Sequence, residues 1–293
     1  MTRIIIDSAS DYDRKEAAEK GIKVVPLTYT VGQESYTDGV DLTSDQFFAL
    51  LERTGAFSQT SQVSPQAAVD AMEEAREEGK KEQGKVPELL CVTLSSVLSG
   101  TFNSMELAAN MVDPERIHVV DTRSASAGAR ILADEALRLA EQGMPAAQIA
   151  RELEDLRSRV RIFASLDTLE YLKRGGRIPA TAAAVGDRAQ LKPIISVDQK
   201  GAVGVLSATL GAKRAVSNVV KRFKECGFDS SYPVYAIYSH GTENVELLEH
   251  KLAKEGVIAT RRLQMGPVIG THVGPGAAGV VFVAPRQEQQ VRG

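Results

Sequence analysis

Aromatic residues and cysteines are scarce in this sequence. Its 293 residues include no tryptophan, 5% aromatic residues and two cysteines. A site that stacks on flat rings is therefore not expected. Cys91 and Cys226 lie far apart, without histidines at metal-ligand spacing. We expect reduced thiols and no metal site.

Long apolar runs and a strong net charge are also missing. No stretch approaches the roughly 20 apolar residues that a membrane span needs, and residues 1–3 lead into a strand-like run without the apolar core of a secretion signal. The net charge of −3 gives no broad attraction for nucleic acid or anionic membranes. We expect a cytoplasmic protein without a nucleic-acid partner or an integral membrane segment.

The first half alternates β-branched runs with longer helical patterns, which is typical of βαβ units around a mostly parallel sheet. Strands are predicted over residues 3–7, 23–31, 88–94, 117–121 and 161–166, and helices over residues 43–53, 65–78, 101–111 and 124–142. The charged stretch 73–85 is interpreted as a solvated helix end and loop.

The second half follows a helix predicted over residues 146–159 and has a different pattern. The runs 192–197 and 202–208 flank a glycine-containing turn and predict an antiparallel hairpin. Helices over residues 212–226 and 245–254 and strands over residues 234–238 and 279–284 follow. The prediction is an α/β fold with a mostly parallel N-terminal domain (1–160), an α+β C-terminal domain with a mixed or antiparallel sheet (161–285) and a tail (286–293).

Two segments imitate nucleotide-binding motifs. GPGAAG at residues 274–279 has the spacing of a dinucleotide loop, but a strand-like run follows it where the mechanism needs a helix. Residues 79–85 imitate a P-loop, yet Val86 replaces the required Ser or Thr. We therefore expect no nucleotide cofactor.

Hydroxyl-rich segments follow several predicted strands, where open α/β sheets place their ligand sites. They are residues 7–10, 60–65, 95–101 and 121–122. Each can be a plain helix cap, but together they offer hydrogen-bond donors for one carboxylate. A basic segment at 173–177 contains paired glycines that could direct an arginine toward a ligand, and His272 lies in a glycine-rich loop. A solvated loop and a structural histidine are the alternatives.

Five segments, taken in order, resemble the motifs of the DegV family of bacterial fatty-acid-binding proteins. They are IDS at residues 6–8, TSQ at 60–62, LSSVLSGT at 94–101, YLKRGGRI at 171–178 and GTHVGPGA at 270–277. The segments span nearly the whole chain. The family includes the fatty-acid-binding subunits of bacterial fatty acid kinase.

The resemblance implies a bound long-chain fatty acid, such as palmitate or oleate, with its tail between the two domains. It implies that the carboxylate is held by the hydroxyl groups of four residues: Thr60, Ser61, Ser96 and Ser99. Arg174 and His272 match residues that assist phosphate transfer in kinase-associated members. The expected partner is a fatty acid kinase subunit that supplies ATP, so the chain needs no cofactor and is not an enzyme by itself.

Two other functions stay open from the sequence. A lipid carrier or sensor would bind the acid without any kinase. A self-contained hydrolase would use a serine of residues 95–99 as nucleophile and His272 as base. The hydrolase has no third residue to orient the base, and no G-x-S-x-G motif is present.

Overall fold

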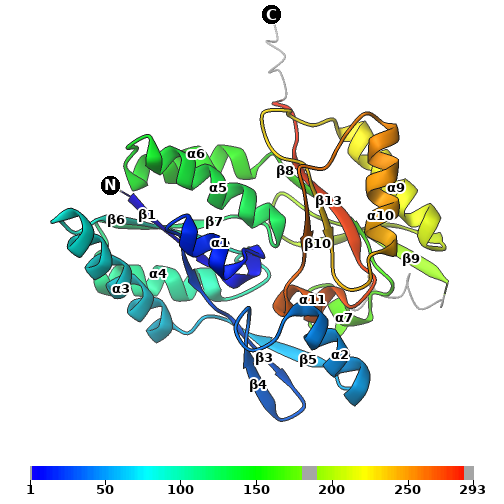
Figure 1. Cartoon of the computed structure of the whole chain (residues 1–293), viewed down its shortest axis with the longest axis horizontal. Helices are drawn as coiled ribbons and strands as arrows, with labels where there is room; N and C mark the ends of the chain where they lie inside the picture. The colour runs from blue at the N-terminus through cyan, green and yellow to red at the C-terminus, as the bar shows by residue number, and fades with distance from the viewer. Residues whose placement is uncertain (1, 180–189, 287–293) are drawn as a thin grey trace, which may run out of the picture.

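The computed structural model describes residues 2–179 and 190–286. A parallel four-stranded sheet forms the centre of the N-terminal part, as Figure 1 shows. Its strand order is β2-β1-β6-β7, with β1 at Thr2–Asp7, β2 at Lys23–Val25, β6 at Glu88–Thr93 and β7 at Ile117–Asp121. The predicted parallel sheet is confirmed.

Helices cover both faces of this sheet. Successive side chains of a strand point to opposite faces, so Ile5 and Cys91 pack in one apolar cluster while Ile4 and Val92 pack in another. The helices α3 (Pro65–Gln83) and α4 (Thr101–Val112) cover the first face. The helices α5 (Ala127–Glu141) and α6 (Ala146–Arg157) cover the second.

A six-stranded mixed sheet forms the centre of the C-terminal part. Its order is β10-β9-β8-β13-β11-β12. The strands are β8 (Val160–Ser165), β9 (Leu191–Val197), β10 (Val203–Leu210), β11 (Tyr235–Tyr238), β12 (Arg261–Gln264) and β13 (Ala278–Val283). The helices α9 (Ala212–Cys226) and α10 (Glu243–Lys254) cover one face, and α5 packs on the other.

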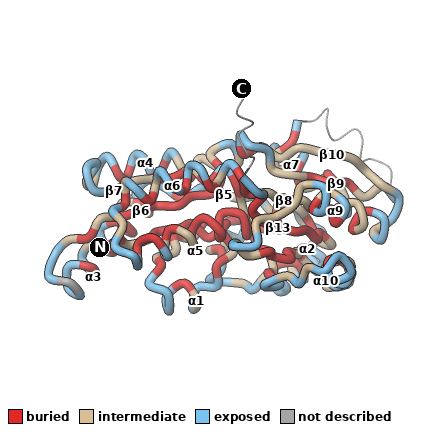
Figure 2. Tube along the Cα trace, turned by 90° about the horizontal axis from the view of Figure 1, so that it is seen from above, coloured by how far each residue is buried: buried red, intermediate tan, exposed pale blue. Residues whose placement is uncertain are grey.

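One apolar core therefore runs through both parts of the chain. It contains Ile4 of β1, Leu132 of α5 and Val281 of β13. Figure 2 shows α5 buried along much of its length. Because α5 packs between the two sheets, separating the two parts of the chain would expose apolar area that is buried around this helix.

A small antiparallel sheet lies beside the large ones. Its order is β4-β3-β5, from β3 (Thr28–Val31), β4 (Glu34–Thr37) and β5 (Ser58–Ser61). The remaining elements within residues 2–179 and 190–286 are η1 (Ser8–Ser10), α1 (Arg14–Glu19), α2 (Ser44–Thr54), α7 (Glu170–Arg174) and α11 (Pro267–Val273). The helix α11 comes late in the chain but packs against α2, β3 and β5 of the N-terminal part.

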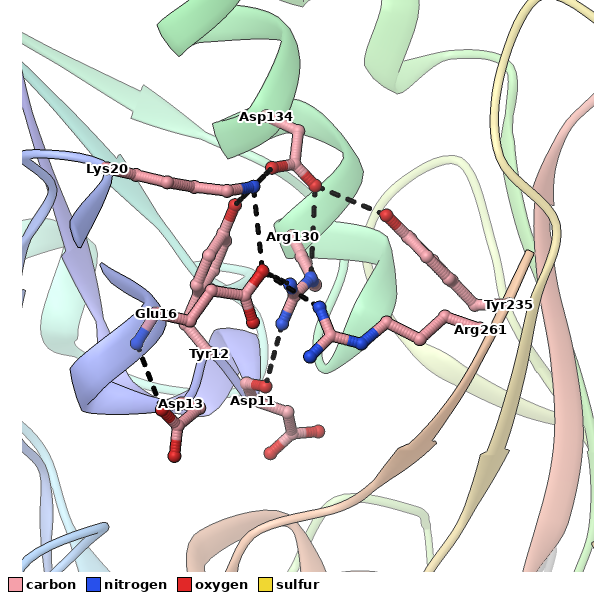
Figure 3. Close-up of polar contacts among 9 residues, drawn as sticks. All are labelled: Asp11, Tyr12, Asp13, Glu16, Lys20, Arg130, Asp134, Tyr235 and Arg261. Carbon is pink, nitrogen blue, oxygen red and sulfur yellow. Dashed lines mark hydrogen bonds and ion pairs between the residues drawn. The ribbon is translucent and has the colours of Figure 1, made fainter. Parts of the chain in front are cut away.

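Polar contacts also join the two parts (Figure 3). Arg130 of α5 is only 2% exposed and pairs with Glu16 of α1, whose carboxylate also pairs with Arg261 of β12 at 2.8 Å. Asp134 of α5 accepts a hydrogen bond from Tyr235 of β11 at 3.3 Å. These contacts tie β11 and β12 to α1 and α5.

Three local predictions were wrong. The expected strand 23–31 is two strands in different sheets, because Pro26 lacks an N–H donor and interrupts the ladder. The helix expected to end at residue 78 continues to Gln83, since its charged residues are good helix formers and Arg3 pairs with Glu78 and Glu82. The segment interpreted as a glycine-rich loop around His272 is the helix α11.

Candidate functional site

A cavity of about 390 Å³ lies between the N-terminal part and the inner face of the six-stranded sheet. Leu27 and Leu94 contribute to its wall from one side, and Ile162, Ile195 and Ile237 contribute from strands β8, β9 and β11. Aliphatic walls of this kind favour an apolar ligand, such as a hydrocarbon chain, over a polar one.

Polar residues from four separate segments also line the cavity: Thr60 and Ser61 of β5, Ser99 before α4, Arg177 after α7, and His272 of α11. The Oγ1 atom of Thr60 lies 2.9 Å from Nε2 of His272. Arg177 donates from Nε to the backbone oxygen of Leu98 at 3.0 Å. The fold thus brings residues more than 200 positions apart into one polar group.

His272 is held as a neutral imidazole. Burial, together with the nearby positive charge of Arg177, lowers the pKa of His272 to about 4. Its Nδ1 atom is buried and has no hydrogen-bond partner among residues 2–179 and 190–286. A Cβ atom on Gly175 would lie 2.2 Å from that Nδ1, so only glycine leaves room for the ring. When Nε2 carries the proton, it donates to Thr60 and leaves the threonine hydroxyl proton for a ligand acceptor.

Arg177 brings a positive charge to the lining. Its side chain is half-buried, and this burial lowers the pKa of the guanidinium. Sequence reasoning missed this residue and selected Arg174 from the same segment. The paired glycines before Arg177 were the available signal, but nothing in the spacing distinguishes which arginine points inward.

The structure places two predicted site residues elsewhere. Arg174 is exposed, pairs with Glu170 at 2.7 Å and lies 3.7 Å from the centre of the Phe57 ring. Ser96 donates its hydroxyl to Asp121 at 2.6 Å and is not a lining residue of the described cavity. These two side chains are therefore engaged outside the polar group around Thr60.

Within residues 2–179 and 190–286, no group of three His, Cys, Asp or Glu side chains is arranged to hold a metal ion. No helix in the described part of the chain has the length and apolar character of a membrane span.

The fold and the cavity define a class: an α/β protein with two large sheets, a small third sheet and an aliphatic cavity that has a polar, cationic section. A profile of the DegV family of uncharacterised proteins matches residues 1–285. A DegV domain-containing protein of Caldanaerobacter subterraneus subsp. tengcongensis is 34% identical over 282 residues, covering 95% of this chain and 97% of the relative. The chain belongs to the DegV family.

Solved structures show the same fold. A DegV family protein from Thermus thermophilus, described by its fatty acid binding, has a TM-score of 0.84 and 32% identity, covering 97% of this chain and 99% of that chain. DegV of Bacillus subtilis, described as a fatty acid binding protein, has a TM-score of 0.80 and 26% identity, with 97% and 99% coverage.

Proposed function

We propose that this protein binds a long-chain fatty acid in the cavity, with the tail against the aliphatic walls and the carboxylate near Thr60, Arg177 and His272. The observation that carries the proposal is an aliphatic cavity whose lining includes a half-buried arginine beside a threonine–histidine pair. The fatty-acid-binding relatives from Thermus thermophilus and Bacillus subtilis support the same ligand class.

The buried tail would supply most of the binding free energy. Each buried methylene contributes about 0.8 kcal/mol, so about fourteen of them contribute up to roughly 11 kcal/mol before the loss of motional freedom is subtracted. The negative charge of the carboxylate must then be balanced by a partner, because an unpaired ion in an apolar cavity is strongly disfavoured. Arg177 supplies the opposite charge, and hydroxyl groups supply hydrogen-bond donors.

The hydroxyl groups differ in how well they can serve the carboxylate. Thr60 is the first choice, because its contact with His272 fixes its orientation. Ser99 also lines the cavity, while Ser61 is exposed and lies at its edge. We therefore propose Thr60, Ser99 and Ser61 as head-group contacts, with Arg177 in place of Ser96.

We also propose that a separate kinase subunit phosphorylates the bound acid. A carboxylate oxygen would attack the γ-phosphorus of ATP held by the partner, the bond to the bridging oxygen would break, and ADP would leave with that electron pair. The exposed guanidinium of Arg174, 55% accessible, suits contact with a partner and its phosphates. His272 would keep Thr60 and the carboxylate oriented during the transfer.

The binding proposal is tested by mass spectrometry of an organic extract from the full-length protein purified from bacteria. We expect a long-chain fatty acid in roughly stoichiometric amount, because the buried tail slows release. Titration of delipidated protein with palmitate and oleate provides the second measurement. An extract without fatty acid, combined with no binding of either added acid, contradicts the proposal.

A further inference from the structure

The start of α11 is held by two acidic residues from the other end of the sequence. The backbone N–H of Gly266 donates to Oδ1 of Asp11 at 2.7 Å, and the N–H of Val268 donates to Oδ1 of Asp38 at 3.2 Å. The first N–H groups of a helix have no partner within the helix. Gly266 has no side chain to cap α11, so Asp11 and Asp38 supply the acceptors from 255 and 230 residues away.

This attachment leaves little freedom at the helix start. Asp38 is only 3% exposed, and a Cβ atom on Gly266 would lie 3.2 Å from the Asp11 carboxylate. Ser44 of α2 adds a hydrogen bond to the backbone oxygen of Met265 at 3.0 Å. Three residues of the N-terminal part thus fix the segment that enters α11.

The other end of α11 carries the residue that matters for the ligand. His272 lies in the last turn of α11, where Nε2 meets Thr60 at 2.9 Å. A seven-residue helix is about 10 Å long and bends little. A shift or rotation at Gly266 would therefore be transmitted to the imidazole.

We infer that Asp11 and Asp38 are positioning residues for the carboxylate site, acting through α11 to hold His272 against Thr60. The inference rests on the proposed function, since it assigns a head-group role to that pair. It assigns no direct ligand contact to either aspartate, because neither lines the cavity in the described part of the chain. Asparagine is the conservative replacement for Asp38, because it has nearly the same shape and keeps an acceptor oxygen for the N–H of Val268.

The test compares affinity for palmitate and for hexadecanol, which has the same tail and no carboxylate. The full-length wild-type protein should prefer palmitate, and Thr60→Ala should reduce that preference. We expect Asp38→Ala to reduce it about tenfold, a loss of about 1.4 kcal/mol, while hexadecanol affinity stays within about twofold. Asp38→Asn should restore the preference to within about threefold, because its oxygen still accepts from Val268.

A spectroscopic measurement follows His272 directly. Its imidazole pKa, lowered to about 4 in the wild type, should move toward 6.5 in Asp38→Ala when titrated by NMR, because the ring leaves its buried position. Asp229→Ala is the matched control. It also removes a carboxylate that accepts a backbone N–H, from Ser231 at 3.1 Å, and its charged partner is Arg159, so it should leave both the ligand preference and the His272 titration unchanged.

The outcomes separate the inference from the proposed function. If wild type and Thr60→Ala differ but Asp38→Ala retains the full preference and the low His272 pKa, the positioning role is overturned and the binding site stands. If wild type shows no preference for palmitate, the head-group site fails and the inference fails with it. Should Asp38→Ala not fold, Asp11→Gly decides in its place, since glycine accepts the positive φ of 53° at residue 11.

Discussion

At the scale of single residues, Arg174 and Arg177 show how burial separates similar side chains. They lie three positions apart, yet Arg177 lines the cavity while Arg174 pairs with Glu170 on the surface. A desolvated cation interacts strongly with a carboxylate because little water screens the pair. An exposed cation interacts weakly with its neighbours and is available to a partner.

Replacing each arginine by methionine tests this division. Arg177→Met should lower palmitate affinity by about 10- to 100-fold, because it removes a charged hydrogen-bond partner worth about 1.5–3 kcal/mol. Arg174→Met should leave affinity within about twofold, but lower acyl-phosphate formation by about tenfold when a cognate kinase subunit and ATP are supplied. The measurements are calorimetric titration and a coupled phosphorylation assay. Equal losses of affinity in both variants would contradict the assignment.

At the scale of elements, the sequence predicted the helices and strands whose own apolar residues mark the face that they bury. The helix at Ala212–Cys226 has the predicted bounds, because its apolar residues repeat with the helical period. The strand at Ile117–Asp121 also has the predicted bounds, because it is a short run rich in β-branched residues. The strand β5 reads SQTS and has no apolar alternation. It forms because β3 pairs with it and α11 packs against it, and neither contact is visible locally.

The candidate site, like the elements, was predictable only in part. Thr60, Ser99 and His272 could be selected because they lie in the segments that resemble the DegV motifs, and all three line the cavity. Their mutual approach could not be derived, since it depends on where α11 packs. The inward direction of Arg177 and the engagement of Ser96 by Asp121 also depend on tertiary contacts.

The contact between α7 and α11 gives a prediction at this scale. Gly175→Ala should displace His272, because the new Cβ atom would lie 2.2 Å from Nδ1. Palmitate affinity should fall by about tenfold, equivalent to 1.4 kcal/mol, with little change in hexadecanol affinity. The control is Gly204→Ala on β10, where nothing lies within 4 Å of the added atom. If the two variants bind palmitate equally well, Gly175 is not needed to seat the histidine.

At the scale of the whole molecule, apolar and polar contacts join the two parts of the chain. The apolar core is continuous from β1 through α5 to β13, and Glu16 connects Arg130 of α5 with Arg261 of β12. A division into domains at residue 160 stays a prediction. Because the connection is extensive, we expect the described parts to unfold together.

The carboxylate of Glu16 makes this connection dependent on pH. Burial alone would raise its pKa, but hydrogen bonds from Arg130 and Arg261 outweigh burial and lower the pKa from 4.5 to about 2. A lowered carboxyl pKa stabilises the fold above pH 4.5, and this stabilisation is lost as the pH falls toward 2. Glu16→Gln should therefore reduce the free energy of unfolding at pH 7, with a difference from wild type that shrinks below pH 4.5.

Urea unfolding at several pH values measures this difference. In Glu16→Gln the buried Arg130 keeps Asp134 at 3.8 Å but loses its contact with the charged Glu16, which should destabilise the protein at neutral pH by about 1.5–3 kcal/mol. The matched control is Glu19→Gln, an exposed residue on the same helix, which should change stability by less than about 0.5 kcal/mol. A Glu16→Gln difference that stays constant from pH 7 to pH 3 would show that the charge of Glu16 is not what stabilises the contact.

The pairing of Thr60 with His272 also has a consequence during synthesis of the chain. The two residues are 212 positions apart, and translation adds about 5–20 residues per second, so Thr60 is made roughly 10–40 s before its partner. During that interval β5 exists without α11, and a nascent chain lacks the imidazole that orients the threonine. The carboxylate site of the proposed function can therefore be complete only after residue 272 has been made.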